Sequence, residues 1–297
     1  MPSRPVHRLS QRLRESYRKN RGEIQGVFLR RYPDFVFDGR AGAARDAVPV
    51  FALHTVEPET FARQLRHLAT NDYATLESAD AFLECLAGER PIRPHSLLLT
   101  FDDGLEDLHS VAFPLLAEHG FRAVSFLVPS FVGKPGFCGW GQIREMQESG
   151  VIDFQSHTLC HRFAGDWPRF VPCRDGAERC VAQEERHPSM EEDFRRAREI
   201  IEDELGKPVR HLCYTDYDGC DASVAASRRA GYSSNFWGVI PERTISCRGD
   251  DPYRIPRVAD DYLLSLPGEG RETLWEIQRR RLRRHGPALL RALRAPA

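Results

Sequence analysis

Hydrophobic and polar positions follow a repeated strand-and-helix pattern over residues 47–260. Short apolar runs bounded by turn residues predict strands at 48–53, 73–78, 96–101, 122–128, 151–156, 209–215 and 232–237. Between most of these runs the apolar positions recur with helical spacing, which predicts helices at 59–69, 105–119, 141–149, 189–205 and 221–230. Strands that alternate with helices pair in parallel through βαβ crossovers. We therefore expect an α/β fold whose seven-stranded sheet is either open or closed into a distorted, TIM-like (β/α)7 barrel.

The flanks of this pattern divide the chain into three parts. Residues 1–46 form a predicted basic N-terminal extension, 47–265 the α/β domain, and 266–297 an arginine-rich helical tail. An irregular stretch at 162–187 lacks either periodicity and predicts a long loop over one rim of the sheet.

Composition places the chain among soluble globular proteins. Of its 297 residues 41% are hydrophobic and 29% charged, which excludes disordered, collagen-like and coiled-coil classes. A formal net charge of −1 hides an uneven distribution: residues 1–31 carry +7, residues 271–297 carry +6, and the remainder carries −14. Arginine outnumbers lysine 39 to three. Such enrichment suits anionic ligands, but we favour an arginine-rich genome as its cause.

Targeting signals and cysteine spacing indicate a cytoplasmic protein. The N-terminal residues carry charges throughout and no apolar core, so we expect no secretory signal, and no apolar run reaches 18 residues. The eight cysteines form no C-x2-C pair, which favours free thiols in a reducing compartment. A structural zinc site at Cys173, Cys180 and His187 is the alternative to a solvated insertion there.

Two pairs of polar residues follow predicted strands, where parallel sheets collect their chemistry. Asp102 and Asp103 come directly after the strand at 96–101, and His157 and His161 follow the strand at 151–156. Histidines four residues apart share one face of a helical turn. Two imidazoles and one carboxylate leave coordination positions open, as in catalytic metal sites, and the second carboxylate then remains available as a base.

The motifs TFDDG (100–104) and SHTLCH (156–161) resemble those of the polysaccharide deacetylase family, the NodB-type carbohydrate esterases of family 4. The resemblance extends over about residues 47–260. It implies that Asp103, His157 and His161 hold one divalent metal ion and that Asp102 is the catalytic base. Zn²⁺ is the first choice, with Co²⁺, Ni²⁺ or Fe²⁺ as alternatives.

The chain departs from the family pattern at the predicted strand 209–215. The family's proline-containing Tyr-Pro-x-Gly or Arg-x-Pro-Tyr element is replaced by Tyr214-Thr215-Asp216-Tyr217-Asp218-Gly219. We take Tyr214 and Asp216 as candidate substrate-binding residues, and the acidic side chain of Asp216 or Asp218 would face a cationic or amino substrate.

A second departure concerns the general acid. The late Leu-x-His motif that supplies this residue in many members is missing, and we favour His54 as the replacement, with a core histidine as the alternative. Arg254 and Arg257 are further candidates for the substrate site, where they would orient Asp102 through a charge-assisted bond; the alternative is a surface arginine at either position.

Together these features predict a metal-dependent hydrolase that removes an N-acetyl or other small N-acyl group from an amino sugar. With no export signal expected, the substrate would be an intracellular saccharide, nucleotide sugar, lipid-linked sugar or secondary-metabolite glycoside. A hydrolase of a non-sugar amide and a non-catalytic binding homologue are the alternatives. We expect no nucleic-acid partner, since no recognition motif accompanies the basic ends. Solvated surface helices are preferred there over weak peripheral membrane association. The sequence leaves the oligomeric state undetermined.

Overall fold

The computed structural model describes residues 24–38, 46–161, 170–172, 178–180 and 189–283. Its strands are β1 (Ala47–Val48), β2 (Val50–Leu53), β3 (Ala74–Thr75), β4 (Ser96–Asp103), β5 (Ala123–Leu127), β6 (Ile152–Ser156), β7 (Phe170–Pro172), β8 (Glu178–Cys180), β9 (His211–Cys213), β10 (Ser234–Phe236), β11 (Ser246–Cys247) and β12 (Val258–Ala259). Its helices are α2 (Asp34–Phe37), α3 (Pro58–Thr70), α4 (Ala79–Ala87), α5 (Phe113–His119), α6 (Trp140–Glu148), α7 (Met190–Leu205) and α8 (Asp221–Arg229). Shorter helical turns are η1 (Ile24–Phe28), η2 (Leu108–Ala112), η3 (Pro129–Phe131), η5 (Thr215–Tyr217) and η6 (Asp260–Ser265).

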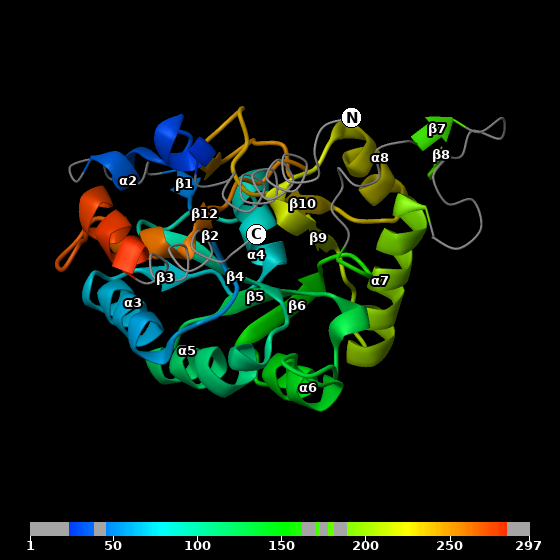
Figure 1. The fold of residues 1–297 in the computed structure, drawn as a ribbon, viewed down its shortest axis with the longest axis horizontal. Coiled ribbons are helices and arrows are strands. Elements are labelled where there is room, and N and C mark those ends of the chain that lie inside the picture. The colour runs from blue at the N-terminus through cyan, green and yellow to red at the C-terminus, as the bar shows by residue number, and fades with distance from the viewer. Residues whose placement is uncertain (1–23, 39–45, 162–169, 173–177, 181–188, 284–297) are drawn as a thin grey trace, which may run out of the picture.

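The main sheet confirms the predicted α/β fold. Its strands are all parallel and lie in the order β10-β9-β6-β5-β4-β2-β12, and Figure 1 shows α3, α5, α6, α7 and α8 around its outside. Six predicted strands occupy this path, five with narrower bounds and β4 extended by two residues to Asp103. The predicted strand at 73–78 contributes only the two-residue β3, which pairs with β4 beside the path. The seventh strand, β12, was not predicted. It is only two residues long and lies shortly after a proline, so it is too short to show the alternation of a strand.

Backbone hydrogen bonds join the two edges of this sheet. The amide of Asn235 donates to Pro252, and the amide of Ile255 donates back to Asn235 at 3.1 Å. Trp237 in turn donates to Ile255 at 2.8 Å. Residues 252–257 lead directly into β12, which pairs with β2. The sheet therefore curls into the distorted barrel expected from the sequence.

The helix α4 was not predicted, and it fills one end of the barrel. The Ser78 side chain accepts a hydrogen bond from the amide of Ala81 at its start, and Gly88 ends it with a φ of 79°. Its Phe82 packs 5.9 Å from the ring of Phe236. Because α4 is short and apolar on the face it buries, the sequence offered too few turns to reveal a helical period.

Side chains of the strands separate into an inner and an outer layer. On β4, Leu98 belongs to the inner cluster, whereas Leu97 and Leu99 belong to the outer cluster beneath the helices. The inner cluster centres on Phe126 and Phe236, whose rings lie 4.9 Å apart. Alternation along β4 places Thr100 and Asp102 on the same inner side as Leu98. The end of β4 thus delivers one carboxylate into the mouth of the barrel.

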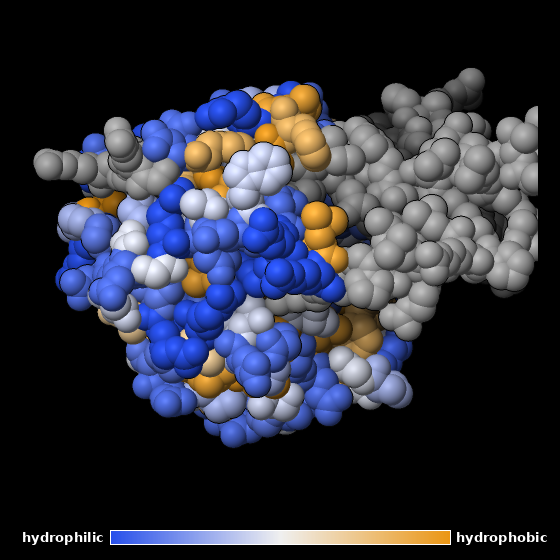
Figure 2. Space-filling model, turned by 60° about the vertical axis from the view of Figure 1, so that its left-hand side comes forward, coloured by the Kyte–Doolittle hydropathy of each residue, from blue (hydrophilic) through white to orange (hydrophobic). Residues whose placement is uncertain are grey.

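The described parts of both terminal segments pack against the barrel. Phe35 of α2 is buried, and its carbonyl accepts a hydrogen bond from Arg271 at 2.8 Å. Ile277 is buried as well, in the helical residues 274–283. Figure 2 shows mostly hydrophilic surface on this side, with a few hydrophobic patches. No described helix has the length and apolar character needed to cross a bilayer.

Several sequence predictions fall on residues outside this description. They include most of the 1–46 extension, residues 284–297 of the tail, and the greater part of the 162–187 insertion with Cys173 and His187. Within that insertion β7 and β8 form an antiparallel pair. The three-part division of the chain therefore stays a prediction.

The inner cluster should dominate stability. Replacing Phe126 with Ala would leave a cavity between β5 and β10, and we expect the free energy of unfolding to fall by about 3–5 kcal/mol. Leu29→Ala, at a side chain with 57% exposure, should change it by less than about 0.5 kcal/mol. Urea denaturation measures both values, and equal effects would contradict this assignment of the core.

Candidate metal centre and catalytic carboxylate

The two adjacent aspartates at the end of β4 lie in different surroundings. Asp102 is 2% exposed, whereas the Asp103 side chain retains 18% exposure. Asp103 has a φ of 72°, a left-handed conformation that is uncommon for any residue other than glycine. This turn separates the two carboxylates, so neighbouring residues can take different roles.

The two histidines reach the same place from β6. The His157 amide donates to the Leu127 carbonyl at 2.7 Å, which continues the pairing of β6 with β5. The chain then turns, with left-handed φ values at Thr158 (65°) and His161 (53°). The Thr158 hydroxyl accepts a hydrogen bond from the His161 amide at 3.1 Å. The four-residue spacing had suggested a helical turn. The two histidines instead converge through a turn that contains left-handed residues.

Asp103, His157 and His161 form a three-ligand cluster, as the family resemblance implied. The Asp103 Oδ1 atom lies 3.5 Å from His157 Nε2 and 3.2 Å from His161 Nε2. These atoms lie within 4.8 Å of one another, and Asp103 Oδ1 is buried without a hydrogen-bond donor among the described residues. A buried, unsatisfied carboxylate oxygen between two imidazoles fits a divalent cation such as Zn²⁺.

A backbone carbonyl orients the His157 ring toward the cluster. Its Nδ1–H donates to the Cys213 carbonyl at 2.8 Å, which leaves the Nε2 lone pair facing the cluster. Burial lowers the pKa of His157, so the ring is neutral and able to bind a metal. Burial also lowers the pKa of His161, but the adjacent Asp103 carboxylate, together with the charges of Asp216 and Asp102, outweighs that effect, so the pKa of His161 rises overall.

Asp102 is held by a buried, bidentate ion pair with Arg257. The Arg257 nitrogens lie 2.7 and 2.8 Å from the two carboxylate oxygens, and its remaining donors bond Thr100 and the Trp237 carbonyl. Burial raises the pKa of Asp102, but the charge and hydrogen bonds of Arg257, together with the nearby His157 and His54, outweigh that effect and hold the pKa well below its ordinary range. Asp102 is therefore ionised, oriented and separate from the metal ligands.

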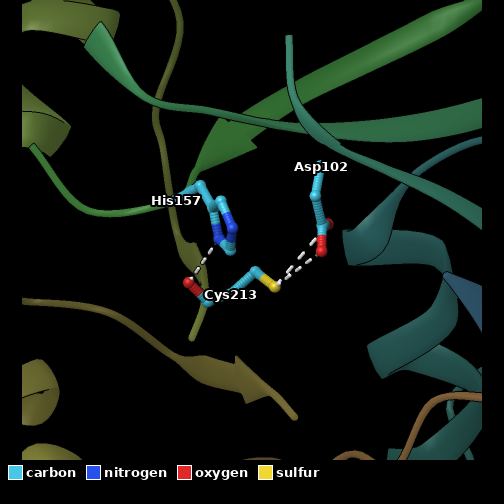
Figure 3. A group of neighbouring side chains, drawn as sticks. All are labelled: Asp102, His157 and Cys213. Atoms are coloured by element: carbon cyan, nitrogen blue, oxygen red, sulfur yellow. Dashed lines mark hydrogen bonds between the residues drawn. The ribbon is translucent and has the colours of Figure 1, made fainter. Parts of the chain in front are cut away.

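The thiol of Cys213 lies against the same carboxylate. Figure 3 shows it directed at Asp102, with distances of 3.7 and 3.8 Å from Sγ to the two oxygens. Burial raises the pKa of Cys213 well above its ordinary value, so the thiol stays protonated and acts as a weak donor. Asp102, His157 and Cys213 could also ligate a cation, but both carboxylate oxygens already accept a hydrogen bond from Arg257, whose positive charge disfavours a cation there. The sequence did not identify Cys213 as a site residue, because it belongs to no recognisable cysteine motif.

His54 stands at the mouth of the site, just after β2. Its Nε2 atom lies 3.7 Å from Asp102 Oδ2, and its side chain is 37% exposed. The opposite ring atom, Nδ1, lies 3.2 Å from the hydroxyl of Tyr217. The structure thus places His54 beside the Asp102 carboxylate, with its ring partly open to solvent.

The remaining candidates have three different placements. Asp216, exposed and with a φ of 51°, lies close enough to affect His161. Tyr214 is only 1% exposed, and its hydroxyl accepts a hydrogen bond from Asn235, so its ring is part of the core and cannot contact substrate as predicted. Arg254 was expected beside Asp102, but its guanidinium instead pairs with Glu242 and Asp221. Arg257 alone of this arginine pair orients the base.

Comparisons with known proteins found similarity to deacetylases. Residues 89–234, just under half of the chain, match the family model described as polysaccharide deacetylase. The relatives are carbohydrate deacetylases, the enzyme class expected from the motifs.

Among curated relatives, the Staphylococcus epidermidis poly-β-1,6-N-acetyl-D-glucosamine N-deacetylase is 26% identical over 214 residues, which make up 69% of this chain and 68% of that protein. The Bacillus subtilis protein YxkH is 31% identical over 106 residues, or 36% of this chain, and the match spans only 37% of YxkH.

Solved structures support the fold. IcaB from Ammonifex degensii superimposes with a TM-score of 0.61 at 23% identity, over 76% of this chain and 97% of that one. The Streptococcus pyogenes deacetylase PplD gives a TM-score of 0.60 at 18% identity, over 79% and 99%. The distorted barrel is therefore shared with deacetylase structures.

Removing one ligand should abolish metal binding. Wild-type protein in zinc at about 100 times its dissociation constant should gain about 2.7 kcal/mol of stability, and His161→Ala should lose this gain. His109→Ala, which removes a histidine paired with Glu145, should retain it, and so should Cys213→Ala. Zinc-dependent thermal shifts and bound-metal analysis test this. Retention of zinc by His161→Ala with loss in Cys213→Ala would instead favour the Asp102, His157 and Cys213 set.

Arg257→Met should destabilise the fold by about 3–5 kcal/mol, because it leaves a buried carboxylate without its counter-ion. Arg254→Met is the matched control: it removes an exposed pairing and should cost less than about 1 kcal/mol. Urea denaturation of both variants at neutral pH makes the comparison, and similar losses would contradict the ranking.

The Arg257→Met deficit should also depend on pH. In the wild type the depressed pKa of Asp102 contributes stability above the unfolded value of about 4, and this is lost only as the pH falls through the folded value. Without Arg257, burial raises the pKa of Asp102, so the variant gains stability relative to wild type as the pH falls from about 7 toward about 4. A deficit that stays constant over this range would show that Asp102 does not cause it.

Proposed function

We propose that this protein is a metal-dependent N-deacetylase that hydrolyses the acetamido group of an N-acetylated amino sugar. The observation that carries the proposal is the division of labour at the end of β4. Asp103 and two histidines form a three-ligand set that leaves coordination positions open. Asp102 is paired with Arg257 and lies outside that set. Hydrolytic metal sites need both features: open coordination positions and a separate base.

A divalent ion at this centre would polarise the acetyl carbonyl and lower the pKa of the attacking water to about 7. Asp102 accepts the proton of that water as the new C–O bond forms. Arg257 occupies one lone pair on each Asp102 oxygen, and the others remain available for this transfer. His54 Nε2, on the open side of the carboxylate, donates a proton to the departing nitrogen as the C–N bond breaks. The products are acetate and the amine of the sugar.

The proposed substrate follows from the chemistry of the site and from the relatives. Amino sugars fit a centre with acidic residues at its rim, because deacetylation produces an amine that becomes cationic. The Staphylococcus epidermidis relative, a poly-β-1,6-N-acetyl-D-glucosamine N-deacetylase, supports β-1,6-linked N-acetylglucosamine oligomers as the first probe. Nucleotide sugars and lipid-linked sugars are the second group of probes, on the proposal that the protein acts in the cytoplasm.

Asp102→Asn should abolish deacetylation while leaving the metal bound. We expect kcat to fall by about 10²- to 10⁴-fold with zinc content near that of wild type, because Asn keeps the shape of Asp but cannot accept the proton. Asp153→Asn, at a carboxylate paired with Lys207 at the start of β6, should keep full activity. Acetate release and amine labelling on both substrate groups measure the effect. If wild-type, zinc-loaded protein deacetylates none of these sugars, the proposed function is wrong.

A further inference from the structure

Tyr217 lies at the active-site mouth, in a loop where this chain departs from its family. The loop follows β9 and is turned by two successive left-handed residues, Asp216 (φ 51°) and Tyr217 (φ 62°). The Tyr217 carbonyl accepts a hydrogen bond from the Gly238 amide at 2.8 Å. A Cβ atom at Gly238 would lie 2.4 Å from that of Tyr217, so only glycine permits this approach. The backbone of Tyr217 is thus held against the end of β10.

The Tyr217 side chain contacts both residues that flank Asp102. Its hydroxyl lies 3.2 Å from His54 Nδ1, and the two rings meet edge to face with centroids 5.5 Å apart. Its ring also lies 5.3 Å from the guanidinium carbon of Arg257. A tyrosine packed against the arginine that fixes the base therefore also touches the proposed acid.

The hydrogen-bonding needs of a protonated His54 indicate a role for the Tyr217 hydroxyl. A general acid must carry its proton on the atom that faces the leaving group, and His54 Nε2 faces Asp102 at 3.7 Å. In the imidazolium both nitrogens are donors: Nε2–H points toward the carboxylate, and Nδ1–H requires an acceptor. The Tyr217 oxygen is in place to be that acceptor. Burial raises the pKa of Tyr217 well above its ordinary value, so it serves as a neutral hydroxyl.

We propose that Tyr217 is a positioning residue for His54, holding Nδ1–H so that Nε2 is the atom that transfers the proton. This inference rests on the proposed deacetylase function. During C–N cleavage the Nε2–H bond breaks and an N–H bond forms on the leaving amine. His54 is then neutral with its remaining proton on Nδ1, still bonded to Tyr217. Asp102 returns the proton that it took from water to Nε2, and both groups are reset.

Tyr217→Phe removes this hydrogen bond and keeps the ring. An amine leaves only after protonation, whereas para-nitrophenyl acetate releases a stable phenolate without a general acid. We therefore expect kcat for an N-acetylglucosamine oligomer to fall by about 10- to 100-fold, with KM and para-nitrophenyl acetate hydrolysis within about twofold of wild type. Tyr253→Phe is the matched control, since it removes a hydroxyl bonded to the Tyr232 carbonyl. It should leave both reactions unchanged.

A double-variant cycle identifies the route of the effect. If Tyr217 acts through His54, then adding Tyr217→Phe to His54→Ala should cause no further loss on the amide substrate. Equal loss of amide and ester hydrolysis in Tyr217→Phe, full retention of both, or an undiminished loss in the His54→Ala background would each overturn the inference. If the wild type hydrolyses the ester but no N-acetyl sugar, the proposed function fails and this inference falls with it.

Discussion

The buried ion pair between Asp102 and Arg257 is the constraint on which the rest of the site depends. Both side chains are essentially inaccessible, and the transfer of two charges out of water costs several kcal/mol per ion unless geometry and hydrogen bonding compensate. Here each carboxylate oxygen and each guanidinium nitrogen has a partner. Arg257 reaches Asp102 only because residues 252–257 connect the two edges of the sheet. Closure of the barrel and orientation of the base are therefore one requirement.

That pairing also separates two chemically identical side chains. A carboxylate bonded twice to arginine is a poor competitor for a cation, whereas its neighbour Asp103, rotated by a left-handed backbone, presents an unsatisfied oxygen to two imidazoles. Left-handed residues recur around the centre, at Thr158, His161 and Tyr217. Such conformations cost of order 1–3 kcal/mol each and persist where surrounding contacts impose them. The strained backbone conformations therefore lie next to the side chains that form the candidate metal site and its surroundings.

The sequence predicted what depends on period and on motif, and missed what depends on closure. The apolar runs of β4, β5 and β6 predicted these strands. The motifs after β4 and β6 identified Asp102, Asp103 and the two histidines as candidate site residues. The two-residue β12 and the plugging helix α4 carry little periodicity, since their places are set by packing inside a barrel already formed. For the same reason the sequence could not distinguish the roles of Arg254 and Arg257. The two arginines are only three positions apart, yet Arg257 lies in the barrel interior and Arg254 near the surface. Tyr214 was misplaced because a buried aromatic and a substrate-contacting one look alike at a strand end.

The two departures from the family pattern have a common physical explanation. Proline fixes φ near −65°, so it could occupy neither Asp216 nor Tyr217, whose φ values are 51° and 62°. Loss of the proline-containing element is thus compatible with a loop that folds inward and brings a tyrosine hydroxyl to His54. That histidine comes from the end of β2, on the other side of Asp102 from the two metal-site histidines. As the proposed proton donor, His54 needs a partner for its second ring nitrogen, and the altered loop places the Tyr217 hydroxyl there.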